Sequence, residues 1–573
     1  VVVAGENAER LARVLALRPG VRVRTVDEDL GGDPVECVVA DAANGPGLTA
    51  MLSAHGYLIL RMDESGSVRD EAARCLKEVG FVPYRMWPDT PDRSEPMSKT
   101  VDMLAVRAGY NPLEHAHALF REGAPERCYG VLKLIPPAYL ADPDTAARVY
   151  ADMQYCLAAT IDSVTPEQRL ARFFHAQAHF YRVVCRVPSF RDAYHTQAEL
   201  WCAMGNADMG LRLLRTLQHL WPNDETAQLI ETWPARPPRV APAPEIVEWK
   251  PGDAKTRILM LLSPVQPHFL IDVIYDGLCA ALGDDEVVEF PWKPTLHGQP
   301  AKSAGQYPCL FDRPGAALEL EQVTEDLRRG RFDCVLFCDF DWGVNPNVYR
   351  QIFDAAGDTP VFLLDGQDDP KDNRVDFEAM FKRPVRGYFK REMLVCHDYG
   401  PGVYPMPFAY PENRIAGDID GPRPEIVFWA GNRQCALRRP YIEHVERLLG
   451  VQFNAAYTPG EYLLALRRAR IGINIFGMGY DTVRYWELPA NGCMLLSERP
   501  PIHIPNDFRD GESAVFFGDA KELEEKVLYY ATHPEEASAI AAAGYAHLKQ
   551  HHTGAVRARQ MLGWIGQTIG HRT

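Results

Sequence analysis

Two series of apolar runs, separated by helical segments, constrain the C-terminal half of this chain more than any other feature. One series opens with RILMLLSP (257–264) and the other with EIVFWAGN (425–432). Runs that are apolar on both faces are typical of parallel strands covered by helices on both sides of a sheet. We therefore predict two α/β domains, at residues 251–408 and 409–573, the second closed by C-terminal helices.

A proline-rich segment precedes these domains. WPARPPRVAPAP (233–244) carries five prolines and no helical period. Prolines at this density favour an extended, semi-rigid chain. Residues 233–250 are predicted to be a stiff linker.

The segment at 113–232 is helical in pattern and repeats itself after about 34 residues. It resembles tetratricopeptide repeats at Ala176, Phe180, Pro188, Ala198, Trp201, Gly205, Gly210, Leu214 and Pro222. This resemblance implies two to three helical pairs with a concave surface that binds a peptide or a protein. His175 and His179, one helical turn apart, are interpreted as polar positions of a repeat helix, because no third metal ligand accompanies them.

Residues 1–112 alternate strand-like and helix-like stretches, which predicts a Rossmann-like α/β domain. The late pair GFVPYRM and TVDMLAVRA resembles the second half of a class I methyltransferase. The glycine-rich turn of such enzymes is missing, because AGENAE offers only Gly5, although acidic residues follow the second strand at 27–29. We expect a noncatalytic or docking module that does not bind S-adenosylmethionine.

Composition narrows the class of protein. The 573 residues include 61 Lys and Arg against 77 Asp and Glu, a formal net charge of -16, which argues against broad binding to nucleic acid or to an anionic membrane. No apolar run reaches the length of a membrane span, and the N-terminus lacks the order of a signal peptide, so we expect a cytoplasmic protein. The 13 cysteines show no zinc-binding spacing and are expected to be reduced.

The stretch TVRYWELPANGCMLL (482–496) places Glu487 among apolar and aromatic residues. A buried carboxylate needs a partner. Arg484 on the same helix face can supply one as a simple ion pair. Alternatively Glu487 accepts hydrogen bonds from the hydroxyls of a ribose or hexose, while Arg484 and the helix N-terminus attract a diphosphate.

A family resemblance favours the second interpretation. Arg484, Glu487, Ala490 and Gly492 resemble the R-x-[FW]-E-x-x-[AS]-x-G signature of the CgeB-like glycosyltransferases, which are similar to the retaining family 4. The segments LLDGQDDP, YFKRE and FRDGESAVFF also resemble that branch, so the resemblance spans about 255–566. It implies a GT-B pair of Rossmann-like domains, a nucleotide-sugar donor of UDP or GDP type, and a contact between Glu487 and the ribose.

Further donor-binding residues are predicted around the second series of strands. Arg433, Arg438 and Arg439 follow EIVFWAGN, and at least one is expected to reach the diphosphate, although an arginine pair that begins a helix is also often only solvated. The predicted nucleotide-sugar-binding residues are Gly431, Arg433, Arg438, Arg439, Tyr480, Arg484, Glu487 and Gly492. Family 4 enzymes often carry a second glutamate where this chain has Gly479, so the sugar and the stereochemical outcome stay open.

The loops that follow strands of the first domain carry the candidate catalytic groups. They include Gln266, His268, Asp365, Asp368 and Asp369. His268 or Asp368 is the predicted base if the reaction inverts configuration, whereas a retaining reaction needs no such base. Asp368 and Asp369 can instead cap a turn before Pro370. No metal is expected in the reaction, because arginines, helix dipoles and amides can stabilise the leaving diphosphate.

These patterns together predict a three-part glycosyltransferase. The acceptor is expected to be a protein, of surface or flagellin type, docked on the helical repeats. A surface polysaccharide or lipid-linked glycan is the alternative acceptor, and a noncatalytic scaffold is the alternative class of protein. No nucleic-acid partner and no integral membrane segment are expected, and the sequence leaves the oligomeric state open.

Overall fold

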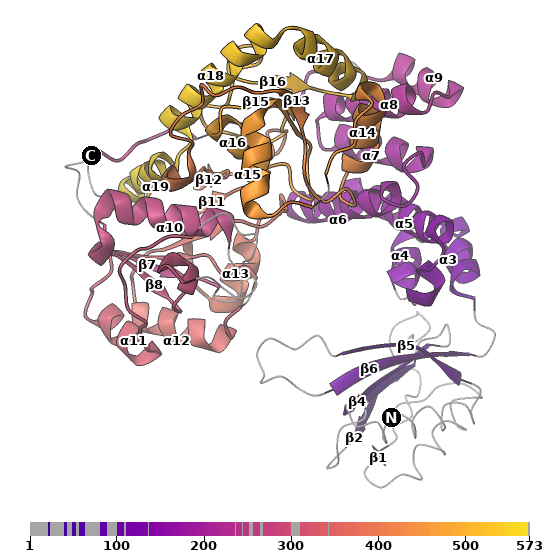
Figure 1. Ribbon diagram of the computed structural model, residues 1–573. Helices are drawn as coiled ribbons and strands as arrows, with labels where there is room; N and C mark the ends of the chain where they lie inside the picture. Colours follow the sequence, from indigo (N-terminus) through magenta and orange to yellow (C-terminus); the bar gives the residue numbers. More distant parts are fainter. Residues whose placement is uncertain are drawn as a thin grey trace. The chain divides into compact units, whose positions relative to one another are not determined.

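The computed structural model describes residues 111–570, with gaps at 134, 136, 235, 243, 251–255, 264–267, 300–309, 342 and 455, and six strands before them (Figure 1). Two compact units make up the chain, Val1–Ala146 and Ala147–Thr573. Gln266 lies outside the described residues. So do two of the helix-like stretches of the first segment, ERLARVLAL (9–17) and VRDEAARCLKEV (68–79), which predict helices.

The first unit contains an antiparallel sheet followed by two helices. The strands lie in the order β1-β2-β3-β4-β6-β5, and every described pair is antiparallel. Their bounds are β1 Val21–Arg22, β2 Val39–Ala42, β3 Thr49–Leu52, β4 Tyr57–Asp63, β5 Phe81–Pro88 and β6 Thr100–Arg107. The helices are α3 Pro112–Arg121 and α4 Pro125–Lys133.

These strands differ from the Rossmann-like sheet predicted for the segment. Only residues 43–48 separate β2 from β3, and only residues 53–56 separate β3 from β4. A parallel pair needs a crossover of a dozen or more residues, so such short connections can join antiparallel neighbours only. The predicted late pair, β5 and β6, is present, while the methyltransferase resemblance stays a prediction.

Five helices lead from the first unit into the second, α5 Pro143–Ala158, α6 Pro166–Val184, α7 Arg191–Ala203, α8 Ala207–Leu220 and α9 Asp224–Thr232. Gly205 adopts a positive φ of 86° in the turn between α7 and α8. Gly210 lets the two helices approach, because a Cβ there would lie 2.7 Å from the carbonyl oxygen of Ala198. Two glycines of the predicted repeat thus make a turn and a close approach, and the tetratricopeptide assignment stays a prediction.

These five helices are called the helical connector below. His179, on its helix α6, packs against other side chains. Its side chain is buried, and its ring stacks on Tyr150 with 5.9 Å between the centroids. Neither His175 nor His179 belongs to a group of described residues that could hold a metal ion. Their interpretation as positions of a repeat helix stays a prediction.

The first predicted α/β domain contains a parallel sheet in the order β12-β11-β10-β9-β7-β8. The strands are β7 Ile258–Leu261, β8 Val287–Phe290, β9 Cys334–Phe337, β10 Val361–Asp365, β11 Val385–Lys390 and β12 Val403–Pro405. The helices are α10 Phe269–Leu282, α11 Leu320–Arg328, α12 Pro346–Ala356 and α13 Arg374–Phe381.

The second α/β domain has a parallel sheet in the order β13-β14-β15-β16. The strands are β13 Glu425–Phe428, β14 Ala469–Asn474, β15 Met494–Glu498 and β16 Val515–Phe517. The helices are α14 Arg438–Leu449, α15 Pro459–Arg468, α16 Val483–Ala490, α17 Ala520–Thr532, α18 Pro534–His551 and α19 Gly554–Ile569. The two parallel sheets predicted for this half of the chain are confirmed, and the bounds of the two domains stay a prediction.

One expected strand is absent from this domain. The pattern of VQFNAAY (451–457) predicts a short strand, but the described residues of this segment form none. The main chain of Phe453 bonds to side chains instead: its N–H donates to Glu446 at 2.7 Å, and its carbonyl accepts from Arg433 at 3.3 Å. These bonds satisfy polar groups that a neighbouring strand would otherwise have to meet.

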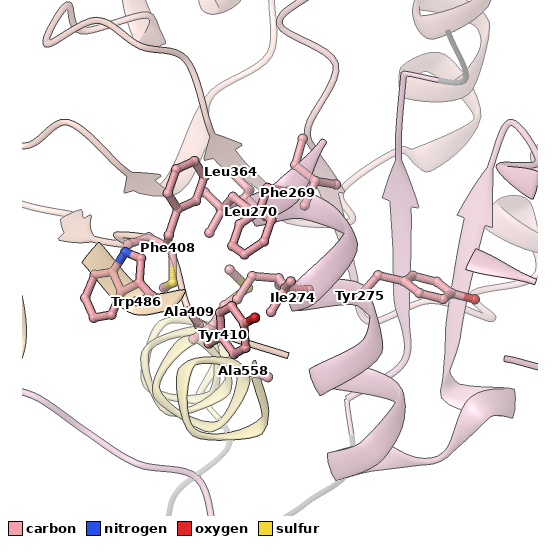
Figure 2. Packing of buried hydrophobic residues seen from close by; sticks show 14 of the residues in the cluster. Phe269, Leu270, Ile274, Tyr275, Leu364, Phe408, Ala409, Tyr410, Trp486 and Ala558 are labelled. Carbon is pink, nitrogen blue, oxygen red and sulfur yellow. The ribbon is translucent and has the colours of Figure 1, made fainter. Parts of the chain in front are cut away.

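The last helix, α19, returns to the first α/β domain and packs along α10. Figure 2 shows side chains from both domains meeting in one core: Phe269, Leu270, Ile274, Leu364, Phe408, Ala409, Tyr410, Trp486 and Ala558. The residues of the predicted linker also pack here, since Trp564 donates to the carbonyl of Glu245 at 2.9 Å and Trp249 N–H to that of Arg559 at 3.0 Å. The two domains therefore share a core.

Replacing Gly277 by alanine is expected to destabilise the contact between α10 and α19. A Cβ at Gly277 would overlap the main chain of Gly554, so one helix must shift. We expect the free energy of unfolding to fall by about 1–3 kcal/mol, as for other overpacked sites. Gly460→Ala is the matched control in α15, where no atom lies within 4 Å of the added Cβ, and it should be neutral or stabilise by up to about 1 kcal/mol. Equal urea midpoints for the two variants would contradict this packing.

Candidate active site

A cavity of about 570 Å³ lies at the carboxyl ends of strands from both parallel sheets. Ligands of open α/β sheets bind at this edge. The first α/β domain contributes His268, Phe269, Asp341, Gly366, Gln367, Asp368, Arg391 and Phe408. The second domain contributes Cys435, Arg438, Gly477, Met478, Gly479, Asp481, Thr482, Val483 and Arg484. Four predicted site residues are thus brought together: His268, Asp368, Arg438 and Arg484.

A buried ion pair positions the first domain's side of the cavity. Lys390, at the end of β11, lies 3.0 Å from Asp365, at the end of β10, and both side chains have no exposed surface. Lys390 also donates to the carbonyl of Asp369 at 2.7 Å. Burial raises the pKa of Asp365, but Lys390 and several hydrogen bonds outweigh burial and hold this pKa below its ordinary value. Asp365, expected to face the cleft, instead fixes the loop that carries Asp368.

Asp369 makes the turn that the sequence offered as an alternative. Its carboxylate accepts from the N–H of Lys371 at 2.9 Å, around Pro370. Asp368 does not share this role, because its side chain lines the cavity and is 59% exposed.

Arg391 lies at the centre of the first domain's wall and was not predicted from the sequence. Its guanidinium pairs with Asp368 and with Glu392, and lies 4.4 Å from the ring centroid of Phe408. Its Nε has no hydrogen-bond partner among the described residues. The signal for this residue was the charged triplet KRE at the end of the apolar strand RGYFKRE.

Two arginines face the cavity from the second domain with few partners. Within the described residues, the hydrogen bonds of Arg438 and Arg484 go to the main-chain carbonyls of Ile475 and Ala430. The Nε and Nη1 atoms of Arg484 are buried without a partner in this part of the chain. Burial, followed by the charge of Arg484, lowers the pKa of Arg438. Two like charges held in this way would be stabilised by an anion.

Helix N-termini add to the positive potential. Arg438 begins α14 and Val483 begins α16, and neither Leu437 nor Thr482 caps its helix with a side chain. The hydroxyl of Thr482 instead donates to Asn474 at 2.6 Å. Of the first-turn N–H groups, that of Arg438 donates to the carbonyl of Cys435 at 3.2 Å and that of Tyr485 to the carbonyl of Thr482 at 3.1 Å. The N–H groups of Arg439, Val483 and Arg484 have no bond among the described residues and are open to an anionic ligand.

His268 stands at the start of α10, with its ring against Gly366. A Cβ at Gly366 would overlap the ring, so only glycine fits there. Burial, followed by the charges of Arg391 and Lys293, lowers the pKa of His268 to about 4. The imidazole is therefore neutral at pH 7, and its Nδ1 has no partner among the described residues. It can accept a hydrogen bond from a bound molecule.

A carboxylate from the first domain holds the loop between β14 and α16. Glu392 accepts from the N–H of Tyr480 at 3.0 Å and of Asp481 at 3.1 Å. Burial raises the pKa of Glu392 to about 7 and that of Asp481 to about 6. A Cβ at Gly479 would overlap the carboxylate of Glu392, so a glutamate here, as in family 4, would have to displace that carboxylate.

Arg433 and Arg439, both predicted to bind the donor, lie outside the cavity lining. Arg433 makes two bonds to Glu446, at 2.6 and 2.8 Å. Arg439 pairs with Glu443 one turn further along α14, at 2.9 Å. The structure gives both arginines structural partners.

Tyr480 also lies outside the cavity lining and faces the helical connector. Its hydroxyl donates to Gln177 of α6, and its ring lies 5.8 Å from that of Trp201 in α7. Gly492, with a φ of 68°, makes the turn into β15, where a Cβ would lie 2.6 Å from Ile419. Gly431 borders Arg484, whose Nη2 would lie 3.1 Å from a Cβ there.

Glu487 is buried and lies one turn after Arg484 on α16, behind the cavity lining. Its carboxylate accepts from the hydroxyl of Tyr462 at 2.5 Å. Burial raises the pKa of Glu487. The described bonds of Glu487 and Arg484 thus go to Tyr462 and Ala430 and not to each other, so the simple ion pair is not present.

Comparison with known proteins identifies the type of domain. Residues 414–563 match the model of the family described as "Glycosyl transferase-like". No curated protein sequence matches the chain. Residues 414–563 therefore form a glycosyl transferase-like domain, and the prediction of a glycosyltransferase is confirmed by this match.

Comparison with solved structures finds matches that span about half of this chain. HepE of Anabaena, in complex with UDP and glucose, is 11% identical over 54% of this chain and 99% of its own, with a TM-score of 0.35. A glycosyltransferase from Rickettsia africae is 9% identical over 55% and 99%, with a TM-score of 0.35. An alpha-glucosyltransferase in complex with UDP and a 13-mer DNA is 10% identical over 54% and 99%, with a TM-score of 0.36.

Among the described residues, no helix combines the length and the hydropathy needed to cross a bilayer.

The lowered pKa of His268 predicts a pH dependence of stability. Between its ordinary value of 6.5 and about 4, the unfolded chain binds a proton at this position that the folded chain does not. The free energy of unfolding should therefore fall as the pH falls through this window. In His268→Asn the fall should be smaller, by about 1–3 kcal/mol in all. Urea unfolding of both proteins at pH 7 and pH 4.5 measures the difference, and parallel pH profiles would contradict it.

Proposed function

We propose that this chain transfers a sugar from a nucleotide-sugar donor to an acceptor hydroxyl in the cavity between its two parallel sheets. The observation that carries the proposal is the pair Arg438 and Arg484, whose guanidinium groups face the cavity beside two uncapped helix N-termini. A diphosphate fits such a site, because its oxygens accept from arginine forks and from free N–H groups at once. The leaving diphosphate would be stabilised in the same way.

The acceptor would lie against the first domain's wall. Asp368 is exposed to the cavity, and its carboxylate pairs with the guanidinium of Arg391. The unpartnered Nδ1 of the neutral His268 offers a hydrogen-bond acceptor on the same wall. Either group can orient an attacking hydroxyl and take its proton if the reaction inverts, and the stereochemical outcome stays open.

We further propose that Glu487 binds the ribose of the donor. Its position one turn after Arg484 places a carboxylate next to the diphosphate site on the same helix. The hydroxyl of Tyr462 now donates to this carboxylate, and a ribose hydroxyl could replace it. In the competing interpretation, Tyr462 holds Glu487 permanently and the pair is structural.

A protein remains the proposed acceptor. The helical connector is joined to the loop that borders the cavity, through the contacts of Tyr480 with Gln177 and Trp201. A polypeptide bound along these helices would therefore lie near the transfer site. A glycan acceptor and a noncatalytic scaffold are the alternatives. Intact-mass analysis of candidate acceptor proteins incubated with enzyme and donor separates a protein acceptor from a glycan acceptor.

Removing either cavity arginine is expected to weaken nucleotide binding. Charge-assisted hydrogen bonds contribute about 1.5–3 kcal/mol, so Arg438→Ala and Arg484→Ala should each raise the Kd of the bound nucleoside diphosphate about 10- to 100-fold. Arg439→Ala is the control, because Arg439 is the next residue but pairs outside the cavity. Calorimetry with UDP, GDP and CDP measures the effect. No binding of any of these to the wild type would favour the scaffold.

A pair of ligands tests the role of Glu487. Glu487→Gln should weaken binding of the nucleoside diphosphate about 10-fold or more, because the amide accepts fewer hydroxyl bonds. Pyrophosphate has no ribose, so its Kd should not change. Tyr462→Phe removes the present partner of Glu487 and should leave the nucleotide affinity intact or improve it. Unchanged nucleotide affinity in Glu487→Gln would show that Glu487 is structural.

A further inference from the structure

Three helices from distant parts of the chain bring two histidines and a glutamate together outside the cavity. His219 lies on α8 of the connector, His444 on α14 and Glu524 on α17. The Oε2 atom of Glu524 lies 2.8 Å from Nε2 of His219 and 3.0 Å from Nε2 of His444. In Figure 1 these three helices lie next to one another at the end of the second sheet. The cluster thus joins the connector to the glycosyl transferase-like domain.

A neighbouring hydrogen-bond group fixes the register of these helices. The hydroxyl of Thr216 lies 3.0 Å from that of Tyr441, and it also accepts from the N–H of Ala520 at 3.2 Å. Residues three or four apart on a helix lie on the same face. His219, His444 and Glu524 follow Thr216, Tyr441 and Ala520 by three, three and four residues. Each helix therefore contributes to both clusters, one turn apart.

We propose that His219, His444 and Glu524 bind a divalent transition-metal ion, Zn²⁺ in the first place, which clamps the connector to the glycosyl transferase-like domain. Two imidazole nitrogens and a carboxylate oxygen form a ligand set that binds zinc in proteins, with water as a fourth ligand. The ligand atoms of the three side chains all lie within 4.8 Å of one another.

The ligand atoms, all within 4.8 Å of one another, have to rearrange to hold the ion. Tetrahedral zinc with bonds of about 2.0–2.2 Å keeps its ligand atoms about 3.3 Å apart. The present separations from Glu524, 2.8 and 3.0 Å, have to widen by about half an ångström. The side chains of His219, His444 and Glu524 are 27%, 17% and 30% exposed, so they have room to move and the ion can enter from solvent. The hydrogen-bonded cluster is then the ion-free form of the site.

The proposal is independent of the transfer reaction, because none of the three residues lines the cavity. The function of the bound ion would be structural. A ligand that binds the folded chain and not the unfolded one adds stability that grows with the logarithm of its concentration over its Kd.

Metal content and stability of the untagged full-length chain test the site. The chain is stripped with EDTA, dialysed, titrated with Zn²⁺ by calorimetry and analysed for bound metal. We expect one ion per chain at this site, and a Tm about 2–5 °C higher with saturating Zn²⁺ than with EDTA. Glu524→Gln and His444→Gln should weaken binding at this site at least 100-fold. Bound Co²⁺ should show the visible absorption of a tetrahedral site in the wild type alone.

The matched control is His195→Gln. His195 also lies on the connector and contacts Thr226 at 2.9 Å and Glu225 at 3.9 Å, but it belongs to no group of described residues that could hold a metal ion. His195→Gln should therefore bind zinc like the wild type, while Glu524→Gln, which keeps the cysteines, reports any zinc bound by thiols. If a variant of the cluster fails to fold, the EDTA and Zn²⁺ measurements on the wild type still decide the matter. A Tm unaffected by both, or equal zinc binding by wild type and the folded Glu524→Gln variant, would overturn the proposal.

Discussion

The buried pair of Lys390 and Asp365 is the interaction on which the cavity depends. Removing two charges from water is unfavourable unless every remaining polar atom finds a partner. Asp365 meets this condition through the N–H of Gln367 and the amide of Asn373, both at 2.9 Å, and the hydroxyl of Tyr388. These bonds join the ends of two neighbouring strands and fix the loop between them. The position of Asp368 opposite Arg391 follows from them.

Local patterns in the sequence were sufficient to predict the two parallel sheets, because an apolar run reports burial without reference to distant residues. The same rule placed His268, Asp368, Arg438 and Arg484 at one edge, since the carboxyl ends of parallel strands meet there. It failed at 451–457, where the apolar and aromatic pattern favours a strand but side chains bind the main chain instead. In the first unit, the short strand β3 was not predicted. It pairs antiparallel with both β2 and β4, whereas a Rossmann-like sheet has parallel pairs.

The remaining differences arise from contacts between residues that are far apart in the sequence. The position of Arg433 after a buried strand is typical of a phosphate ligand, but in the structure its guanidinium donates to Glu446. Tyr480 was expected to bind the donor, but its partner Gln177 lies about 300 residues earlier in the chain. The proposed metal ligands lie 80 to 305 residues from Glu524 in the sequence, whereas a metal site is predicted from a sequence by short spacings. Tertiary packing alone brings such groups together.

The contacts of the proline-rich segment change what counts as a domain in this chain. Proline density marks this segment as a boundary, yet Trp249 is buried and Ala241 donates from its N–H to the carbonyl of Val395 at 2.7 Å. The connector before it holds Tyr480, on the loop that borders the cavity. A chain that begins at the prolines would lack Gln177 and Trp201 and leave Tyr480 without these contacts. The frame of the cavity therefore extends across the boundary that the prolines mark, back to α6.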